Sequence, residues 1–494
     1  MAQLDAPFPP GRYPIVVLGS GPGSLQLSAS LGRLGIEHAV LSSDPAPGGM
    51  FRKFPFFQRL ISWTKPYAPA DRPTRTYERY DWNSLIGEEP ETRATVAGFM
   101  DGTTYFPSRV EMEQGLVAFT ERAGIRVRWG CRWESTRRDD GHDFVIGTSD
   151  GEYRCDVVVF GVGMTVPWKP ELDGMEHVPH YVDTRDRKEY ADKRIVIIGK
   201  RNSGFELADG LLPWARQIIL ASPRPTRLSV LTRTVASARA RYLQPYEEHV
   251  LGGGCFVLDA ATERIERTAD GYRVHAGGTT TPGEMVLDCD EVIAATGFTT
   301  PLGDLPELGV STFYQNRLPS QTPYWESPDV PGVYFAGSIT QGSVGLKKYG
   351  IPSGSAAVHG FRYNAVVLAR RLAERFGVAP HRPPVEPERL APYLLEEATT
   401  APELYHQSSY LARVVRLDDL ANEGIVPLQH FVDTAGPDAV AMALENDGTE
   451  LRPCAYLRVG GTVEEHVFPS NAMLDFTTAE HRRQLDGLLK QHLP

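Results

Sequence analysis

The feature that most constrains the fold of this chain is a pattern that occurs twice. A short apolar run leads into a glycine-rich turn, then into a helix with an apolar face and a second apolar run; the two copies occupy 13–42 and 194–222. Two buried parallel strands joined by a helix produce this pattern, and glycines directly after the first strand are typical of a dinucleotide-binding βαβ unit. We therefore predict an α/β fold with two Rossmann-like dinucleotide-binding domains.

The glycine-rich turn of the first unit suits a pyrophosphate. Gly19 permits a tight turn, Gly21 lets backbone N–H groups approach the phosphates, and the N-terminus of the following helix adds positive potential. Ser24 stands where a third glycine normally lets the helix pack closely on the strand. Ser42 replaces the acid that normally binds the ribose hydroxyls, so either Ser42 or the nearby Asp44 is expected to bind the ribose. The residues expected to bind this first dinucleotide are Gly19, Gly21, Pro22, Gly23, Ser24, Ser42 and Asp44.

The turn of the second unit contains one residue that does not suit a dinucleotide. Gly199, Asn202, Ser203 and Gly204 follow the expected pattern, but Arg201 stands where a second glycine is expected. A side chain there should crowd the pyrophosphate. Two interpretations stay open. Either Arg201 points outward or pairs with a phosphate and the domain binds its dinucleotide, or the arginine fills the site and only the fold is retained.

The strand after this turn favours NADPH over NADH. It ends in Ser222 instead of an acid, and Arg224 and Arg227 follow closely. Arginine binds phosphate through charge-assisted hydrogen bonds, so this arrangement is suited to the 2′-phosphate that NADPH carries and NADH lacks.

Further apolar segments indicate how the chain continues around the two units. Apolar runs occur at 155–163, 290–298 and 332–338, and each ends near a glycine. We expect each run to form a sheet strand whose end lies at a nucleotide site. A long helix is predicted over 353–376, with Gly377 as its end.

A C-terminal extension follows a proline-rich linker at 381–392. Within it, residues 439–459 predict a β-hairpin that turns at Asp447-Gly448. We predict that the second dinucleotide-binding domain is inserted in the first and that an α+β extension ends the chain. The predicted ranges are 1–188 and 291–378 for the first domain, 189–290 for the second and 379–494 for the extension.

Composition excludes several classes of protein. The 494 residues allow about three domains, and the apolar runs are far shorter than the roughly 20 residues of a membrane helix. No signal-type apolar stretch opens the chain, and a net charge of −11 opposes binding to nucleic-acid phosphates. We therefore expect a cytoplasmic protein that binds neither membranes nor nucleic acid. The sequence leaves a homo-oligomer open.

The five cysteines lie far apart and form no C-x-x-C pair, and the thirteen histidines do not cluster. This spacing fits a reducing compartment and supplies no neighbouring pair for a redox-active disulfide. We expect no metal site.

Four strings in the first three quarters of the chain resemble a known family: VVLGSGPGS at 16–24, GGMF at 48–51, IIGKRNSGFELA at 197–208 and ATGF at 295–298. They are similar to the flavin-containing and N-hydroxylating monooxygenase superfamily, in which an NADPH-binding domain is inserted in an FAD-binding domain. The segments 59–67, 80–87 and 359–365 are more narrowly similar to FAD-dependent oxidoreductase-domain proteins of endoplasmic-reticulum-associated degradation.

The resemblance implies that the first dinucleotide is FAD and the second is NADPH. It adds a double glycine and two later strand ends to the residues expected to bind FAD, namely Gly48, Gly49, Met50, Thr296, Gly297, Gly337 and Ser338. The residues expected to bind NADPH are Gly199, Arg201, Asn202, Ser203, Gly204, Ser222, Arg224 and Arg227.

Three side chains are candidates for catalysis near the flavin, again by resemblance: Asn83, Lys65 and Lys347. Family members carry an amide or charged group after the double glycine, which Asn83 or Lys65 would provide. Lys347 follows the last strand, where a lysine would balance negative charge at flavin N1. The alternatives are a turn-capping amide for Asn83 and a solvated surface position for Lys347.

These expectations combine into a predicted FAD-dependent monooxygenase that uses NADPH and O₂ to hydroxylate a small amine- or heteroatom-bearing substrate. The family fingerprint expected before the second unit is broken at 173–184, where His177 and His180 are mis-spaced. This weakens assignment to the Baeyer–Villiger or the standard flavin-containing monooxygenases and leaves the substrate class open. Two alternatives remain: an FAD oxidase or dehydrogenase that does not use NADPH, and a flavin-binding interaction protein.

Overall fold

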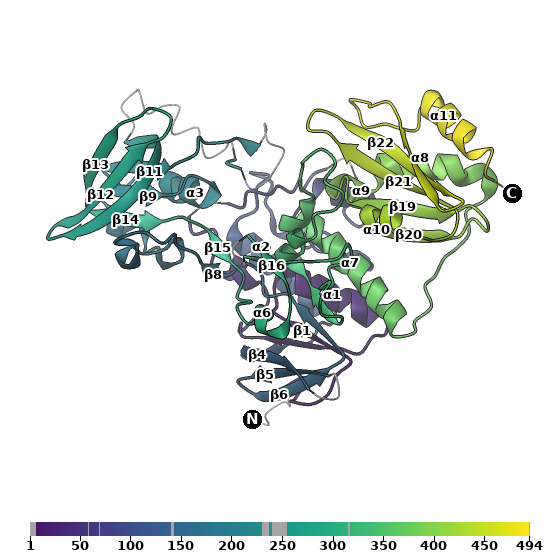
Figure 1. Cartoon of the computed structure of the whole chain (residues 1–494), viewed down its shortest axis with the longest axis horizontal. Helices are drawn as coiled ribbons and strands as arrows, with labels where there is room; N and C mark the ends of the chain where they lie inside the picture. The colour runs from purple at the N-terminus through teal and green to yellow at the C-terminus, as the bar shows by residue number, and fades with distance from the viewer. Residues whose placement is uncertain are drawn as a thin grey trace. The chain divides into compact units, whose positions relative to one another are not determined.

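The computed structural model describes residues 6–57, 59–68, 70–139, 143–229, 237–239, 254–314 and 317–493. The chain forms two compact units. Figure 1 labels their helices and strands. The first unit contains Met1–Arg52, Ser62–Gly163 and Thr300–Pro494, and the second contains Lys53–Ile61 and Met164–Thr299.

A five-stranded parallel sheet organises the first unit. Its strand order is β18-β7-β1-β2-β3, with β1 (Ile15–Leu18) paired to β2 (Ala39–Ser42) and β7 (Val157–Phe160). The edge strands are β3 (Arg128–Trp129) and β18 (Val333–Phe335). Because the strands are parallel, the residues that follow β1, β2, β7 and β18 all lie at the same edge of the sheet.

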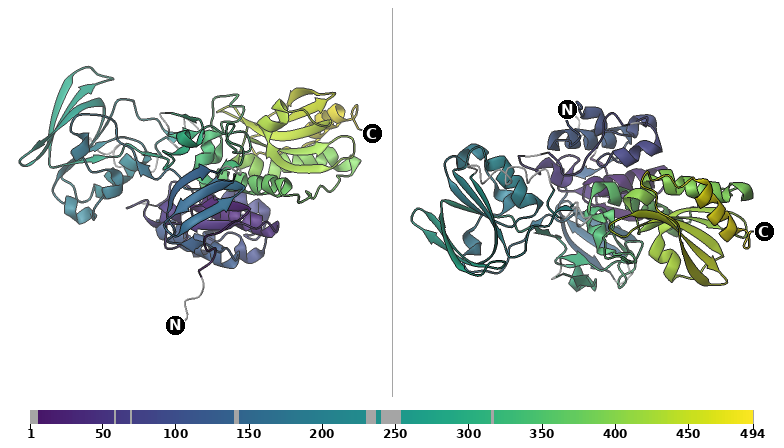
Figure 2. Two further views of the ribbon diagram at one scale, coloured as in Figure 1. Left: turned by 60° about the horizontal axis from the view of Figure 1, so that its bottom comes forward. Right: turned by 90° about the horizontal axis from the view of Figure 1, so that it is seen from above.

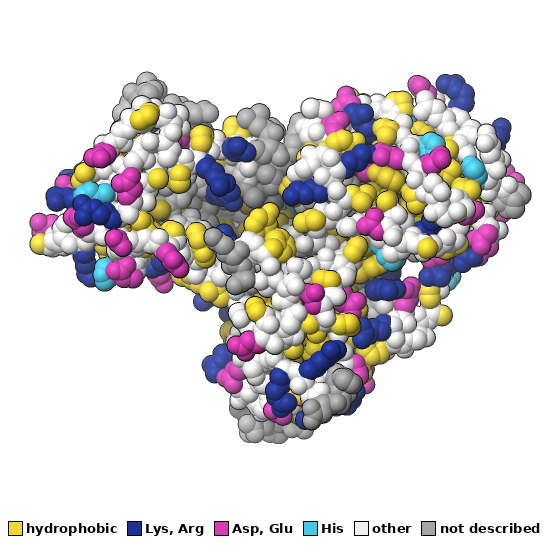
Figure 3. All heavy atoms as spheres, viewed as in Figure 1, with side chains coloured by type: hydrophobic (Ala, Val, Ile, Leu, Met, Phe, Trp, Pro, Cys, Tyr) yellow, Lys and Arg dark blue, Asp and Glu magenta, His cyan; other side chains and the backbone are white. Residues whose placement is uncertain are grey.

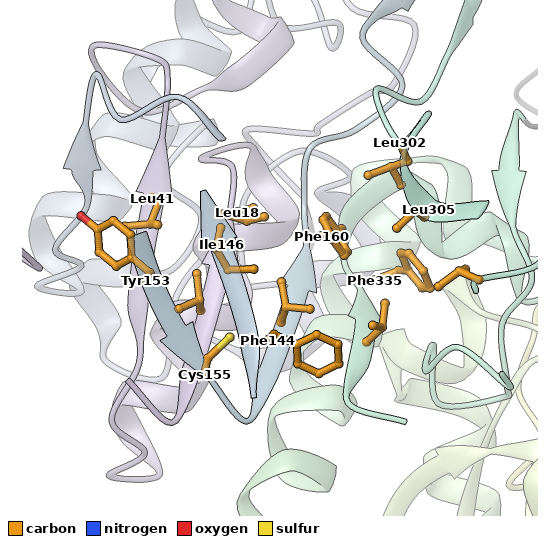
Figure 4. Packing of buried hydrophobic residues seen from close by; sticks show 14 of the residues in the cluster. Leu18, Leu41, Phe144, Ile146, Tyr153, Cys155, Phe160, Leu302, Leu305 and Phe335 are labelled. Atoms are coloured by element: carbon orange, nitrogen blue, oxygen red, sulfur yellow. The ribbon is translucent and has the colours of Figure 1, made fainter. Parts of the chain in front are cut away.

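The core of this sheet is built from large apolar side chains of adjacent strands. Leu18, Phe160 and Phe335 are buried together, and Phe144 of a neighbouring hairpin packs with them (Figure 4). That hairpin belongs to a three-stranded antiparallel sheet of β4 (Trp133–Arg138), β5 (Phe144–Thr148) and β6 (Gly151–Cys155).

Helices α1 (Pro22–Arg33) and α7 (Val358–Arg375) pack against each other in the first unit. The helix predicted over 353–376 is present as α7, but it begins at Val358 because Gly354–Ala356 form a separate 3₁₀ turn. Gly377, with a φ of +84°, follows its end. Other elements of this part are α2 (Arg109–Arg122), α6 (Leu305–Leu308), β16 (Thr312–Phe313) and β17 (Leu318–Pro319).

The second unit contains a six-stranded sheet in the order β13-β12-β11-β10-β9-β14. Its parallel part joins β9 (Arg194–Ile198), β10 (Gln217–Ser222) and β14 (Glu291–Ala294) to the start of β11 (Cys255–Thr268). An antiparallel part adds β12 (Gly271–Gly278) and β13 (Glu284–Cys289). Helix α3 (Asn202–Leu211) follows β9, and the short strands β8 (Val166–Pro167) and β15 (Phe298–Thr299) pair with each other.

The structure places the domain boundaries differently from the sequence expectation. Strand β14 pairs with β9, so 291–299 belong to the second unit instead of the first. Met175 and Val178 pack with Val196 of β9, which draws the segment 164–188 into the same unit. The boundaries expected at 188/189 and 290/291 therefore move to Gly163/Met164 and Thr299/Thr300.

The C-terminal extension forms a five-stranded antiparallel sheet with helices beside it (Figure 2). The sheet order is β20-β19-β21-β22-β23, with β19 (Leu411–Arg416), β20 (Asn422–Pro427), β21 (Ala439–Asn446), β22 (Leu451–Val459) and β23 (Thr462–Val467). The helices are α8 (Leu390–Thr400), α9 (Pro402–His406), α10 (Leu428–Asp433) and α11 (Ala479–Leu489). Strands β21 and β22 confirm the predicted hairpin. The extension belongs to the same compact unit as the first glycine-rich turn.

The predicted fold class is confirmed: a mixed α/β chain with two parallel βαβ units and an α+β C-terminal part. Within the described ranges, no helix is both long and apolar enough to cross a bilayer. On the face shown in Figure 3, Lys and Arg side chains lie interspersed among Asp and Glu side chains.

Candidate functional site

The first glycine-rich turn lies at the carboxyl end of β1. Gly19 has a φ of +104°, and a Cβ on it would lie 2.5 Å from the carbonyl oxygen of Gly161, which follows β7. The Gly19 N–H donates to the Leu41 carbonyl at the end of β2. A side chain at Gly19 would therefore open the turn, as the sequence predicted.

Gly21 differs from the other glycines around it because its side-chain position is open. A Cβ on Gly21 would meet no atom within 4 Å, whereas a Cβ on Gly23 would lie 2.3 Å from Cα of Gly337. Gly21 caps α1 and Pro22 is the first helical residue, so backbone N–H groups of the first helical turn point out of the helix end. This open space at a helix N-terminus fits the pyrophosphate of a dinucleotide.

Ser24 is accommodated by Gly161, the residue directly after the neighbouring strand β7. Its Oγ donates to the Gly161 carbonyl oxygen at 3.3 Å, and a Cβ on Gly161 would lie 1.9 Å from that Oγ. The glycine that usually stands in the helix is thus replaced by a serine, and the space is provided at Gly161 instead.

Ser42 and Asp44, the two candidates for binding the ribose, have different surroundings. Ser42 is buried, and its Oγ lies 2.8 Å from Ser20 Oγ and accepts from the Asp44 N–H at 3.1 Å. Asp44 is half-buried, and one of its carboxylate oxygens accepts from Ser20 at 3.2 Å. The Ser42 hydroxyl thus makes two hydrogen bonds within the protein, whereas the Asp44 carboxylate makes one.

Two further segments expected to bind FAD meet this turn. The Gly48 N–H donates to the Ser20 carbonyl, and a Cβ on Gly49 would lie 3.1 Å from Cα of Gly21. Met50 follows in a short 3₁₀ helix, Gly49–Arg52. On the other side, Gly337 and Ser338 begin the 3₁₀ segment Gly337–Gly342 after β18, where Gly337 packs against Gly23. These residues therefore surround one site.

The second glycine-rich turn repeats the geometry of the first. Gly199 has a φ of +116°, and its Cβ would lie 2.3 Å from the Ala295 carbonyl oxygen that follows β14. A Cβ on Gly204 would lie 2.1 Å from the Gly199 carbonyl oxygen. Asn202 begins α3, and its side chain binds the backbone of Ser237 and Arg239. Ser203 is half-buried in the first turn of this helix.

The side chains around the second turn are mainly solvent-exposed. Arg201 caps α3 in an extended conformation and is exposed, as are Arg224 and Arg227. Ser222, at the end of β10, is half-buried, and its Oγ lies 3.5 Å from the Arg224 carbonyl oxygen. Exposed guanidinium groups beside the end of β10 are available to a phosphate.

Lys200 is a residue of this turn that sequence reasoning missed. Its side chain is 2% exposed; the amine donates to the Leu258 carbonyl at 2.8 Å and forms an ion pair with Asp259. The hydrogen bond from Lys200 lowers the pKa of Asp259, which lies beside Ser222 in the sheet. The pair ties the turn to β11. It has no sequence signal, because the two residues are far apart along the chain.

Thr296 and Gly297 lie in the second unit. Thr296 Oγ1 donates to the Trp168 carbonyl, and the Gly297 carbonyl accepts from the Trp168 N–H and lies 2.9 Å from His180 Nε2. His180 is buried, and burial lowers its pKa. These contacts join the segment around Trp168 and His180 to the segment after β14, both within the second unit. The sequence had grouped Thr296 and Gly297 with the FAD-binding domain.

The three candidate catalytic residues have different surroundings. Asn83 is fully buried: its amide oxygen accepts from Ser62 and its amide nitrogen donates to Thr64 at 3.0 Å. Both ends of this side chain therefore bind protein groups. Lys65 is exposed, with its amine 5.8 Å from the centre of the Trp63 ring, and Lys347 is exposed in a turn with a φ of +48°.

All five cysteines are buried, and none of them forms a disulfide. Burial raises the pKa of Cys155, Cys289 and Cys454 to about 12, and it also raises the pKa of Cys131. A thiol with a raised pKa is a weak nucleophile at neutral pH, because the thiolate is the reactive form.

Comparison with known proteins identifies the family of this arrangement. The model of the family described as pyridine nucleotide-disulphide oxidoreductase matches residues 16–337, a stretch that contains both glycine-rich turns. The chain belongs to this family. Its membership confirms the expected class, flavoprotein oxidoreductases with two dinucleotide-binding domains.

Three relatives show how far the similarity extends. The mouse (Mus musculus) FAD-dependent oxidoreductase domain-containing protein 2 is 26% identical over 441 residues, which cover 82% of this chain and 64% of that protein. The chain therefore spans less than two thirds of that relative.

A ferredoxin–NADP reductase of Salinispora arenicola is 27% identical over 382 residues, or 73% of this chain and 96% of the reductase. The crystal structure of DfoA, the FAD-bound cadaverine monooxygenase of Erwinia amylovora, aligns with a TM-score of 0.59 at 15% identity, covering 74% of this chain and 96% of that one, and shows the shared fold.

Proposed function

We propose that the first unit binds FAD at the site around Gly21. The observation that supports this is the open side-chain position of Gly21 within a ring of closely packed glycines, next to the N-terminus of α1. Backbone N–H groups there would bind the pyrophosphate, and Asp44 would accept hydrogen bonds from the ribose. Gly48, Gly49, Gly337 and Ser338 would line the path toward the flavin.

We further propose that the second unit binds NADPH. The exposed Arg201 leaves the turn between Gly199 and Gly204 able to receive a pyrophosphate, and Arg224 would bind the 2′-phosphate with support from Arg227. This favours a working nucleotide site over one that keeps only the fold. Ser222, which carries no charge, would not repel the added phosphate as an acid would.

The proposed overall activity is that of an FAD-dependent monooxygenase, in which NADPH reduces the enzyme and O₂ then oxygenates a small amine- or heteroatom-bearing substrate. Bound FAD would supply the hydride acceptance from NADPH and the reaction with O₂. The five buried cysteines support this assignment, because they offer no reactive thiol pair that would take electrons from the flavin. We propose that the electrons go instead to an acceptor from solution.

Among the three candidate catalytic residues, Lys347 best fits a role near the flavin. It is exposed and follows the segment Gly337–Gly342 that contributes to the proposed FAD site. A lysine in this position would balance negative charge on the flavin. It would not transfer a proton to or from the substrate. For Asn83, whose amide is bound by Ser62 and Thr64, we propose a structural role in its loop.

A second candidate function is reduction of an external electron acceptor. The ferredoxin–NADP reductase of Salinispora arenicola is matched over nearly its full length, and the same absence of a reactive cysteine pair suits that activity. The two candidates share FAD and NADPH and differ only in the acceptor.

Anaerobic stopped-flow mixing of the purified yellow protein with NADPH and with NADH tests these proposals. Rapid bleaching of the flavin by NADPH supports the use of NADPH, whereas bleaching by neither nucleotide would favour an oxidase. Admission of O₂ with candidate amines then separates the two acceptors. Oxygenated product supports the monooxygenase, and peroxide alone together with rapid reduction of added ferredoxin supports the reductase.

A further inference from the structure

The C-terminal extension reaches the proposed FAD site through two fully buried side chains. The family match ends at residue 337, and the extension begins about forty residues later, so neither the family nor the sequence gave this part a role. We propose that the extension is a positioning domain for the flavin, and that Gln407 and Tyr410 are its positioning residues. The inference rests on the FAD site proposed above.

Gln407 connects the extension to the strand end that carries Gly337. It is fully buried directly after α9, and its amide nitrogen donates to Asn364 Oδ1 and, at 3.1 Å, to Ser355 Oγ. Asn364 of α7 donates in turn to Thr340 Oγ1 at 3.0 Å, and Thr340 donates to the Gly337 carbonyl at 2.7 Å. Each bond in this series is buried, so a change at Gln407 leaves unpaired polar groups in the core next to Gly337.

Gly337 contacts the first glycine-rich turn, where the proposed pyrophosphate site lies. A Cβ on Gly23 would lie 2.3 Å from Cα of Gly337, so the two backbones are in direct contact. A displacement of Gly337 must therefore move the first turn of α1, where the proposed pyrophosphate site lies.

Tyr410 holds the loop that follows the same 3₁₀ segment. Its side chain is buried, and the hydroxyl bonds with Ser343 Oγ at 2.8 Å and with the Pro323 carbonyl at 2.9 Å. Gly345 adopts a φ of +62°, and a Cβ there would lie 2.8 Å from the Tyr410 ring. Absence of a side chain at Gly345 thus lets the ring pack directly on the loop backbone.

The rest of this loop is attached to the C-terminal sheet. Leu346 packs against the core of that sheet, and Lys348 forms an ion pair with Glu465 of β23. The segment 337–348 is therefore bound near its start by Asn364, which Gln407 holds in place, at its centre by Tyr410 and at its end by Glu465. Because this segment contains Gly337, Ser338 and Lys347, the extension fixes one side of the proposed flavin site.

The test compares three full-length variants, Gln407→Met, Tyr410→Phe and Tyr393→Phe, by titrating deflavinated protein with FAD. Tyr393→Phe is the matched control, because its hydroxyl accepts from the Asn422 amide at 2.7 Å between α8 and β20 of the extension and makes no hydrogen bond to the described residues 337–348. We expect Gln407→Met and Tyr410→Phe each to raise the Kd for FAD about threefold to tenfold, the range for one lost hydrogen bond. Tyr393→Phe should leave the Kd unchanged at temperatures where circular dichroism shows all three folded.

A second measurement separates positioning from a loss of stability. The rate of FAD release and the shape of the bound flavin absorption band should change in Gln407→Met and Tyr410→Phe but not in Tyr393→Phe. Wild-type values in the first two variants would overturn the inference, as would an equal weakening in the control. If Gln407→Met does not fold, Tyr410→Phe decides the result.

The coupling must also act in the reverse direction. Addition of FAD to the wild-type apoprotein should slow amide hydrogen exchange at 407–416, since linkage between two sites is reciprocal. Unchanged exchange there would contradict the inference. None of these readouts uses NADPH, so a wild type that binds FAD but is not reduced by NADPH would remove the proposed activity and leave the positioning role standing.

Discussion

In both glycine-rich turns the first glycine has a positive φ, and in both an added Cβ would meet the carbonyl oxygen that follows the adjacent strand. These oxygens belong to Gly161 beside Gly19 and to Ala295 beside Gly199, at 2.5 and 2.3 Å. The two turns thus share the requirement that makes the chain bend sharply from strand to helix. This requirement comes from packing within the protein and exists with or without a nucleotide.

The turns differ at their third residue, 21 or 201, and at their sixth, 24 or 204. The first has an open space at Gly21 and a serine at position 24, whereas the second has an exposed Arg201 and a closely packed Gly204. The comparison shows that a glycine pattern combines two separate demands, backbone packing and room for a ligand. Only substitutions that affect one demand at a time can separate them.

The largest effect is expected for Gly21→Val. The backbone of Gly21, with a φ of −71°, accepts a β-branched residue, and its Cβ meets no protein atom within 4 Å, so the variant should fold. The side chain would occupy the proposed pyrophosphate space, and the purified protein should lose its stoichiometric FAD, measured by absorbance. Gly32→Val, on the exposed face of the same helix, serves as the control and should keep FAD. Retention of FAD by Gly21→Val would show that the cofactor lies elsewhere.

Gly204→Ala should disrupt the second site while leaving the first intact. Its Cβ would lie 2.1 Å from a backbone oxygen, so the turn must shift, at a cost of about 1–3 kcal/mol. We expect NADPH-driven flavin reduction to slow by about a hundredfold at subsaturating NADPH, the upper end of that range, with FAD content unchanged. Ser24→Ala, the matching position of the first turn, should have little effect on FAD, because it removes only a 3.3 Å hydrogen bond. Equal sensitivity at the two positions would contradict the distinction drawn here.

Arg224→Ala tests whether the exposed arginine recognises the 2′-phosphate. Loss of a charge-assisted hydrogen bond costs roughly 1.5–3 kcal/mol, so the Kd for NADPH should rise about tenfold to a hundredfold while that for NADH stays nearly constant. Arg267→Ala, an exposed arginine near the far end of β11, is the control. Titration calorimetry with both nucleotides measures the difference, and an equal loss for NADPH and NADH would remove this assignment.

Arg201→Gly should have the smallest effect. Because Arg201 is exposed and does not fill the turn, its removal should change the Kd for NADPH by no more than about threefold, equivalent to the weak end of a hydrogen-bond contribution. Stopped-flow reduction of the variant and the wild type side by side provides the measurement. A wild type that NADPH cannot reduce, together with a variant that it can, would mean that the arginine blocks the site.

The sequence predicted the parts of the fold that depend on local patterns. The apolar runs located β1, β9 and their following helices, because buried parallel strands and glycine-rich turns have strong composition signals. The hairpin of β21 and β22 was found from its Asp447-Gly448 turn. The residues of both glycine-rich turns follow from the same signals.

Features that depend on contacts between distant segments were not predictable. The space for Ser24 is provided by Gly161, and the buried amine of Lys200 pairs with Asp259. The two residues of each pair are far apart in the sequence, and no motif connects them. The segment Lys53–Ile61 packs with the second unit through Phe54, Phe56 and Phe57, although it follows the double glycine of the first. Tertiary packing decides such positions, and the domain boundaries moved for the same reason.

The burial of all five cysteines makes the protein well suited to spectroscopy in solution. With each native thiol shielded from solvent, a cysteine introduced on an exposed residue would be the preferred target of a maleimide dye. One such label in the first unit and one in the second would report the distance between the two nucleotide-binding regions by energy transfer. The same pair would show how that distance responds when FAD or NADPH is added, without removal of any native residue.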